Sequence, residues 1–311
     1  MPSDFGEGWV SSPIERWMII LLKSGALFWI GGFAAWALHT DVDLAGVWEE
    51  FMAGDIKPVQ ALLLIFILLV ALALVASILK RFDLFVLRLL EGYWPLPLRS
   101  WWVKMRDGRI RERRDELVKL EKEKRAGPLS FKKQAKHAKL DWEFVHIPNR
   151  TDERMPTRLG NILHSMELYP QKRYGLNAFV CWPRLWLLLP EHVRQELVRA
   201  RHNLDVSARI WTWSMLFTIW GVWEPLATPA GLLVSLFAYR WILQAAIIYG
   251  QLVKSAFDLH RFALYESLRW PIPDIFENEQ EEGNKLSNYL FRNFVEKPRQ
   301  NSGSKIIITQ I

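Results

Sequence analysis

Apolar residues in this chain gather into four blocks and do not recur at the intervals of an amphipathic helix or strand. The blocks are residues 17–38, 59–79, 210–223 and 231–250. A helix that crosses a bilayer needs about 20 mostly apolar residues. The third block reaches that length only if its helix begins upstream, near Asp205. The pattern predicts a mainly α-helical, polytopic membrane protein with about four transmembrane helices and a cytoplasmic helical layer.

The first block is the one with an alternative interpretation. It contains Lys23, about one and a half turns from one end, where a lysine can extend its ammonium group to the lipid headgroups. A signal peptide is the weaker interpretation, because the apolar region is too long and residues 1–15 contain no Lys or Arg. The block is therefore predicted to be a span.

Charge between the blocks predicts the topology. Residues 81–204 are rich in Lys and Arg, whereas the loop 40–57 carries five acidic residues against one lysine. Cytoplasmic loops of membrane proteins carry an excess of basic residues. The predicted order is an N-terminal transmembrane hairpin (1–80), a basic cytoplasmic segment with interfacial elements (81–204), a C-terminal transmembrane hairpin (205–252) and a cytoplasmic tail, disordered at its end (253–311). Both termini are then cytoplasmic, in a plasma membrane.

Composition limits the chemistry that the chain can perform. Cys181 is the only cysteine, which excludes an intrachain disulfide and a Cys-rich metal site. The seven histidines show no metal-ligand spacing, and no nucleophile or phosphate-binding motif is present. The sequence therefore predicts no catalytic residue, no cofactor, no metal and no enzymatic activity. An enzyme that acts on lipid through His260 or Glu167 is the weaker alternative.

Residues 99–126 read as a strongly charged helix that ends at Gly127-Pro128. Its arginines could bind anionic lipid headgroups, bind nucleic acid, or form a solvated face held by ion pairs. No aromatic-interleaved basic face accompanies them, so nucleic acid is the least favoured partner. The lipid-surface candidates are Arg106, Arg109, Arg111, Arg113 and Arg114.

Further along, Trp142 to Ile147 alternates like a short strand. A short helix is predicted from Arg158 to Leu168, capped by Thr157 or Asp152 and terminated by Tyr169-Pro170.

The next stretch, 176–189, is apolar but too short to span, and is predicted to lie at the inner membrane surface or under the transmembrane bundle. From Pro190 a helix is predicted to run into the third apolar block.

Polar residues in the cytoplasmic layer are interpreted as buried networks of hydrogen bonds and ion pairs, in preference to catalytic groups. The candidates are Arg158, Asn161, Glu167, Arg173, Tyr174, Arg184, Asp258, His260 and Arg261.

Several short segments carry a resemblance. They are Pro156–Asn161 (PTRLGN), Arg173–Leu176 (RYGL), Trp182–Leu185 (WPRL), Tyr249–Lys254 (YGQLVK) and Phe257–Phe262 (FDLHRF). Together they cover about the second half of the chain, which resembles an uncharacterised family of bacterial multi-pass inner-membrane proteins. The resemblance implies this architecture and location, and it implies no established activity.

Arg240 lies near the middle of the fourth block, and the first, second and fourth blocks contain no Asp or Glu. A charge at that depth is costly and usually has a partner or a pathway. Arg240 is predicted to join helices through Gln244 or backbone carbonyls, to line a hydrated anion path formed by several subunits, or to face a membrane partner or lipid phosphate. The membrane polar candidates are Arg240, Gln244 and Lys23.

These observations lead to two functional hypotheses. The favoured one is a non-enzymatic membrane protein whose cytoplasmic layer senses a signal or partner and whose helical bundle responds, as an oligomeric pore in one form. The alternative is a membrane anchor that recruits a cytoplasmic partner through its basic helix. The predicted partners are a bilayer with an anionic inner leaflet and either a homo-oligomer or a cytoplasmic protein.

Overall fold

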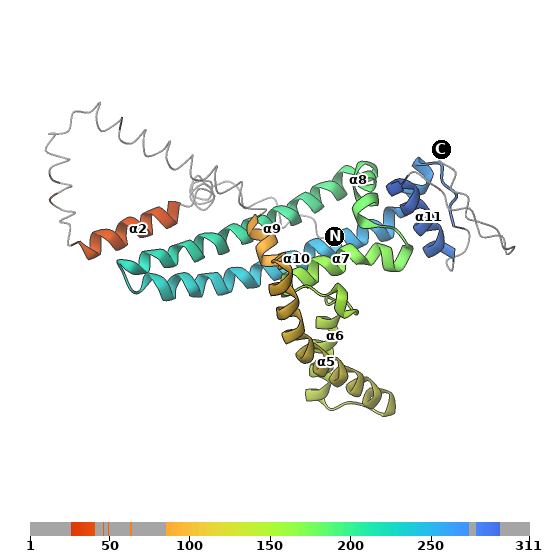
Figure 1. Ribbon diagram of the computed structural model, residues 1–311, viewed down its shortest axis with the longest axis horizontal. Coiled ribbons are helices and arrows are strands. Elements are labelled where there is room, and N and C mark those ends of the chain that lie inside the picture. The colour runs from red at the N-terminus through yellow and green to blue at the C-terminus, as the bar shows by residue number, and fades with distance from the viewer. Residues whose placement is uncertain are drawn as a thin grey trace, which may run out of the picture. The chain divides into compact units, whose positions relative to one another are not determined.

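The computed structural model describes residues 26–40, 85–273 and 278–292, together with three isolated positions between the first two ranges. These residues are almost entirely helical, and no strand occurs among them (Figure 1). The mainly α-helical class is therefore confirmed. Nearly all of the second apolar block, Lys23 and the segment 293–311 lie outside the described residues.

The helices keep the labels of Figure 1. Residues 85–91 are also helical. The elements are α2 (Ala26–His39), α5 (Leu96–Ala126), α6 (Phe131–Phe144), η1 (Thr151–Glu153), α7 (Arg158–Tyr174), α8 (Ala178–Leu188), α9 (Glu191–Phe217), η2 (Thr218–Val222), α10 (Ala227–Ser267) and α11 (Glu279–Arg292).

The chain divides into two compact units. The first comprises residues 1–88 and 203–242, and the second comprises 89–202 and 243–311. Helices α9 and α10 both cross this division along their length. Each of these two helices therefore contributes residues to both units.

Aromatic packing and close backbone contacts hold the first unit together. The ring of Phe28 in α2 lies 5.3 Å from Trp213 of α9 and 5.2 Å from Trp220 of η2. Gly231 in α10 is buried against α9, where an added Cβ would lie 2.8 Å from the Ser214 carbonyl oxygen. A larger residue at position 231 would separate α10 from α9.

By length and composition, α10 could cross a membrane, and it is the only such helix in the described part of the chain. Two shorter apolar helices, Phe28–Ala37 and Ala178–Leu188, are too short for that test. In the third apolar block, α9 ends at Phe217 and gives way to the 3-10 turn η2. The structure thus supports one candidate span, and the predicted number of four stays a prediction.

Helices α5 and α6 form an antiparallel hairpin. As predicted, α5 ends at Ala126, before Gly127-Pro128. The strand predicted over Trp142 to Ile147 is wrong, because α6 runs through Phe144. Leu140 and Phe144 are four residues apart, on one face of α6, and both pack against Leu117 and Leu120 of α5. The helical spacing of these apolar residues outweighs the short alternation.

Helix α7 begins at the predicted cap. The Thr157 hydroxyl accepts a hydrogen bond from the Gly160 amide at 2.9 Å, which satisfies a free donor of the first turn. The predicted end at Tyr169-Pro170 is wrong, since Pro170 lies inside the helix. A proline removes one backbone bond, but the helix continues through it here to Tyr174.

The end of α7 is set by Gly175. Its φ of +72° is in the left-handed region, where glycine is favoured. The Gly175 amide donates to the Gln171 carbonyl at 3.0 Å, and the Leu176 amide donates to the Pro170 carbonyl at 3.2 Å. This is the hydrogen-bond pattern of a helix that ends at glycine.

Helix α11 docks on this turn, although no helix was predicted in the C-terminal segment. An added Cβ at Gly283 would lie 1.8 Å from the Tyr174 carbonyl oxygen, so the two backbones touch. The Ser287 hydroxyl donates to the Gly175 carbonyl at 3.0 Å and accepts from the Asn177 amide at 2.8 Å. The small residues of α11 therefore determine where it binds.

Candidate functional site: a polar cluster around Asp258

Asp258 lies on α10, eight residues beyond the end of the predicted fourth span, and its carboxylate faces two tyrosines of α7. The Tyr174 hydroxyl donates to one carboxylate oxygen at 2.6 Å. The Tyr169 hydroxyl lies 3.0 Å and 3.1 Å from the two oxygens. One carboxylate thus ties α10 to α7 through two hydrogen bonds.

Three cationic side chains surround the tyrosines. The Arg261 guanidinium lies over the Tyr174 ring at 4.2 Å, and Arg173 lies 5.6 Å from the same ring. The Lys254 ammonium is 5.4 Å from the Tyr169 ring. Cations over aromatic faces are attracted by the negative face of the ring. These contacts add to the hydrogen bonds that join α7 and α10.

Arg261 also reaches the third helix of the cluster. Its Nε donates to the buried carboxylate of Glu279 in the first turn of α11, and its Nη1 donates to the Asp258 carbonyl. The side chains of Arg261 and Glu279 are 13% and 4% exposed, so this ion pair is largely shielded from water. Arg261 therefore links the Asp258 cluster to the docking of α11.

Burial and the neighbouring carboxylate raise the pKa of Tyr169, and the same two causes raise the pKa of Tyr174. Burial lowers the pKa of Lys254, while the charge of Asp258 opposes that effect. Both tyrosines therefore remain neutral hydrogen-bond donors near neutral pH, when the usual tyrosine pKa is about 10. The cluster is built to hold a charge in place, and it contains no activated nucleophile.

The structure brings together four of the polar candidates predicted from sequence: Arg173, Tyr174, Asp258 and Arg261. The pattern missed Tyr169, Lys254 and Glu279. Of these three, Lys254 could have been found, because Lys254, Asp258 and Arg261 follow a spacing of four and three residues, which places them on one helix face. Glu279 could not, because its role depends on the docking of α11.

The other polar candidates lie elsewhere. The Asn161 side chain exchanges hydrogen bonds with the backbone of Met155 and also donates to the Thr157 carbonyl, so it fixes the turn before α7. Arg184 donates to the Val180 carbonyl within α8, and Glu167 pairs with His164 at 3.1 Å. Within the described chain, neither Arg158 nor His260 makes a hydrogen bond or ion pair. These residues do not join the Asp258 cluster.

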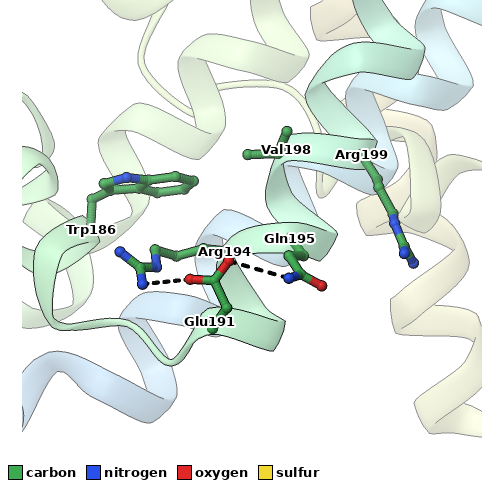
Figure 2. Close-up of a pocket in the computed structure, with 6 residues that line it drawn as sticks. All are labelled: Trp186, Glu191, Arg194, Gln195, Val198 and Arg199. Carbon is green, nitrogen blue, oxygen red and sulfur yellow. Dashed lines mark hydrogen bonds and ion pairs between the residues drawn. The ribbon is translucent and has the colours of Figure 1, made fainter.

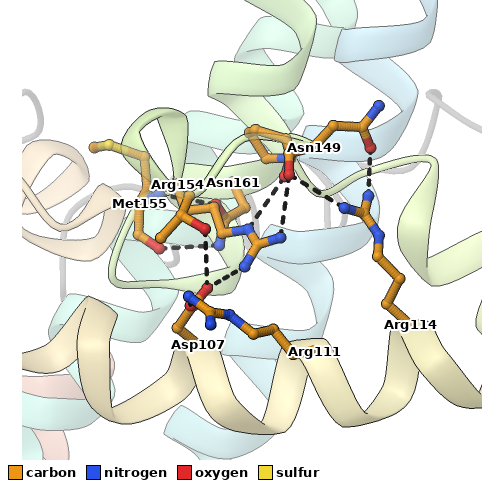
Figure 3. Close-up of polar contacts among 9 residues, drawn as sticks. Asp107, Arg111, Arg114, Asn149, Arg154, Met155 and Asn161 are labelled. Carbon is orange, nitrogen blue, oxygen red and sulfur yellow. Dashed lines mark hydrogen bonds and ion pairs between the residues drawn. The ribbon is translucent and has the colours of Figure 1, made fainter.

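The predicted lipid-surface arginines of α5 mostly bind within the protein. Arg111 pairs with Asp107 at 2.5 Å, and Arg113 pairs with Glu143 at 2.6 Å. Arg114 donates to both the backbone and the side chain of Asn149 (Figure 3). Arg106 donates to the Pro156 carbonyl at 2.5 Å. Arg109 alone is exposed without a hydrogen bond or ion pair in the described residues. The contacts favour the structural interpretation of this cluster over lipid binding.

In the membrane candidate α10, Arg240 and Gln244 are both exposed, and neither forms a hydrogen bond or ion pair with another described residue. The predicted bond between them is absent from these contacts. The roles proposed for Arg240 stay predictions, since most of the first two apolar blocks lies outside the described residues.

His146 leads to a prediction about pH. Its ring lies 4.9 Å from Trp142, and its Nδ1 is 2.8 Å from the Trp142 carbonyl oxygen. Burial lowers the pKa of His146 below its ordinary value, and the charges of Lys254 and Arg158 act in the same direction. Below pH 6.5 the unfolded chain binds a proton at His146 more readily than the folded chain does. The free energy of unfolding therefore decreases as the pH is lowered.

Thermal unfolding at pH 7 and pH 5 measures this effect. His146→Gln is expected to reduce the loss of stability between these two values, by up to about 1.4 kcal/mol for each pKa unit of the shift. His192→Gln, which replaces an exposed histidine of α9, is the control and should leave the pH dependence unchanged. Equal pH dependence in wild type and His146→Gln would contradict the assignment.

Comparison of the chain with family models, with curated proteins and with solved structures finds no match. Among the described residues, no group of three or more His, Cys, Asp or Glu is placed to hold a metal ion. The helices and the Asp258 cluster are therefore the features from which a function can be inferred.

Proposed function

We propose that this chain is a non-enzymatic, multi-pass protein of a bacterial inner membrane, in which the Asp258 cluster responds to a signal or partner and passes that response to the membrane through α10. The single observation that carries the proposal is the continuity of α10, which runs without interruption from Ala227 to Ser267. Its apolar part is the candidate span, and its polar part carries Asp258 and Arg261. A rotation or shift of the polar part would therefore move the span.

The surface of α10 supports its placement in lipid. Large apolar side chains are exposed along the first half of the helix, where water would be an unfavourable environment. They are Leu232, Leu233, Val234, Leu236, Phe237, Trp241 and Ile248. Lipid tails or a second copy of the chain would cover them. Assembly of several copies into a pore stays a prediction.

The orientation proposed for α10 follows from charge. The helix begins after a turn, Trp223 to Leu226, that contains one acidic residue and no Lys or Arg, and the basic helix α5 belongs to the same unit as its C-terminal part. Because basic segments are retained in the cytoplasm, the Asp258 cluster is proposed to be cytoplasmic. Both chain termini are proposed to lie on that side.

The cluster suits a switching role because a single carboxylate holds two helices. Removal of Asp258 would leave the buried Tyr174 hydroxyl without its acceptor and would remove the negative charge that acts on Lys254. A partner that binds the tyrosines or the arginines would have the same effect. The contacts between α7 and α10 would then change as a unit.

A spin label on Gln244→Cys, in the Cys181→Ala background, tests this coupling in the full chain reconstituted in lipid vesicles. Position 244 is exposed on α10, and Cys181, whose pKa is raised to about 11 by burial, is removed so that only one thiol remains. Asp258→Ala is expected to change the mobility and the oxygen accessibility of the label. The physical reason is that α10 loses its side-chain hydrogen bonds to Tyr169 and Tyr174 of α7.

Glu266→Ala is the matched control. Glu266 is an exposed carboxylate on the same helix, two turns beyond Asp258. The spectrum of the labelled Glu266→Ala variant should equal that of wild type. Identical spectra for wild type, Asp258→Ala and Glu266→Ala would refute the coupling.

A further inference from the structure

A pocket of about 470 Å³ lies between α8 and the first turns of α9, and none of its lining residues belongs to the Asp258 cluster. Its lining residues are Trp186, Glu191, Arg194, Gln195, Val198 and Arg199 (Figure 2). The indole ring of Trp186 forms one wall, and the polar side chains of α9 form the other. The pocket thus combines an apolar face with two guanidinium groups.

The charges of this pocket leave donors available for an anion. Glu191 accepts hydrogen bonds from Arg194 at 2.6 Å and from Gln195 at 3.2 Å. The Arg194 side chain is 35% exposed, and its Nε, which is shielded from water, has no hydrogen-bond partner among the described residues. The Arg199 side chain is 71% exposed and pairs with Glu196, which does not line the pocket. Two arginines against one carboxylate give the lining a formal charge of +1.

Exposed apolar side chains continue from the pocket along α8. Phe179, Pro183, Trp186 and Leu187 follow helical spacing and share one face. Phe179 is 85% exposed and Leu187 is 75% exposed. An apolar face beside a basic pocket is the arrangement of a helix that lies in the membrane interface, with its apolar side in the acyl region.

The depth of the pocket agrees with the position of lipid headgroups. On α9, the Arg201 guanidinium lies 5.8 Å from the ring of Tyr249, where the apolar part of α10 ends. The pocket residues, 191 to 199, precede Arg201 on α9 by at most ten residues, or about 15 Å along a helix. Along the helix axis, Arg199 is therefore about 3 Å and Arg194 about 10 Å from Arg201, next to the proposed end of the span.

We infer that this pocket binds the headgroup of an anionic phospholipid, with the phosphate at Arg194 and Arg199 and the acyl chains along the exposed face of α8. Basic pockets on the cytoplasmic side of membrane helices bind such headgroups. The Glu191 carboxylate and the Gln195 amide are placed to bind hydroxyl groups of the headgroup. The inference rests on the membrane location given under the proposed function, and it moves the lipid site from the α5 arginines to α8 and α9.

Native mass spectrometry of the full chain in detergent tests the inference. Dioleoyl phosphatidylglycerol and dioleoyl phosphatidylcholine are titrated separately. Wild type is expected to bind the anionic lipid more tightly, and Arg194→Gln with Arg199→Gln is expected to weaken that binding by about 25-fold, from two contacts of roughly fivefold each. Arg199→Gln alone removes only an exposed side chain, so it remains informative if the double variant is unstable.

Arg125→Gln is the charge-matched control, because Arg125 is an exposed residue of the last turn of α5. It should leave lipid binding unchanged. Equal binding of the two lipids, or equal loss in Arg125→Gln and Arg199→Gln, would overturn the inference. If glycerol phosphate binds as tightly as the anionic lipid and displaces it, the pocket is a site for a soluble anion instead. Membrane insertion of the same variants, measured by carbonate extraction, separates a failure of this site from a failure of the proposed membrane location.

Discussion

Replacement of Asp107 with asparagine is expected to destabilise the second unit by about 3–5 kcal/mol, the cost of leaving one partner of a buried ion pair without the other. Asp107 and Arg154 have side chains that are 7% and 4% exposed, and they form an ion pair between α5 and the loop before α7. Arg154 also donates to the carbonyls of Pro148 and Asn149 (Figure 3). Without the carboxylate, the guanidinium would stay buried beside neutral acceptors only.

Amide hydrogen exchange of residues 148–157 in the full chain measures this change, and the exchange rates should rise strongly in Asp107→Asn. Asp115→Asn is the control, because Asp115 is an exposed aspartate two turns further along α5. A double variant, Asp107→Leu with Arg154→Met, removes both charges and should recover much of the protection. Unchanged exchange in Asp107→Asn would show that the ion pair contributes little.

Local signals in the sequence predict several helix ends correctly. Gly127-Pro128 ends α5 and Thr157 caps α7, because the residue types at these positions act on the adjacent turn alone. The helix that begins after Pro190 also continues into the third apolar block, as its apolar spacing predicts. These features depend on neighbours in sequence.

Features that depend on distant contacts could not be predicted in the same way. The six residues from Trp142 to Ile147 alternate like a strand, but Phe144 packs against α5 and the segment forms the last turn of α6 and the turn after it. Pro170 does not end α7. Gly283 is important because it contacts the Tyr174 carbonyl. The local sequence predicts neither this contact nor the packing of Phe144 against α5.

The candidate site shows the same division. The face formed by Lys254, Asp258 and Arg261 can be derived from α10 alone, as a helical spacing of polar residues after an apolar stretch. The tyrosines that contact this face belong to α7, about 90 residues earlier in the chain. Arg240 lies in the middle of the fourth apolar block and is exposed on α10, and its predicted roles stay predictions.

The second large effect concerns the placement of α10 in the membrane, and it is expected to be all-or-none. In the Cys181→Ala background, single cysteines replace Leu226 in the turn before α10, Phe237 in its apolar part and Ser255 in its polar part. All three positions are exposed in the structure, so differences in their reactivity report on the membrane and not on burial in the protein. Bilayer hydrocarbon excludes a charged, membrane-impermeant maleimide.

Labelling of these three variants in sealed vesicles of both orientations tests the central claim that α10 is at once a membrane span and a member of the Asp258 cluster. Ser255→Cys should react only in inside-out vesicles, and Leu226→Cys should react only in right-side-out vesicles. Phe237→Cys should react in neither until detergent is added. Labelling of all three positions from the same side, without detergent, would show that α10 does not cross the membrane and would contradict the account.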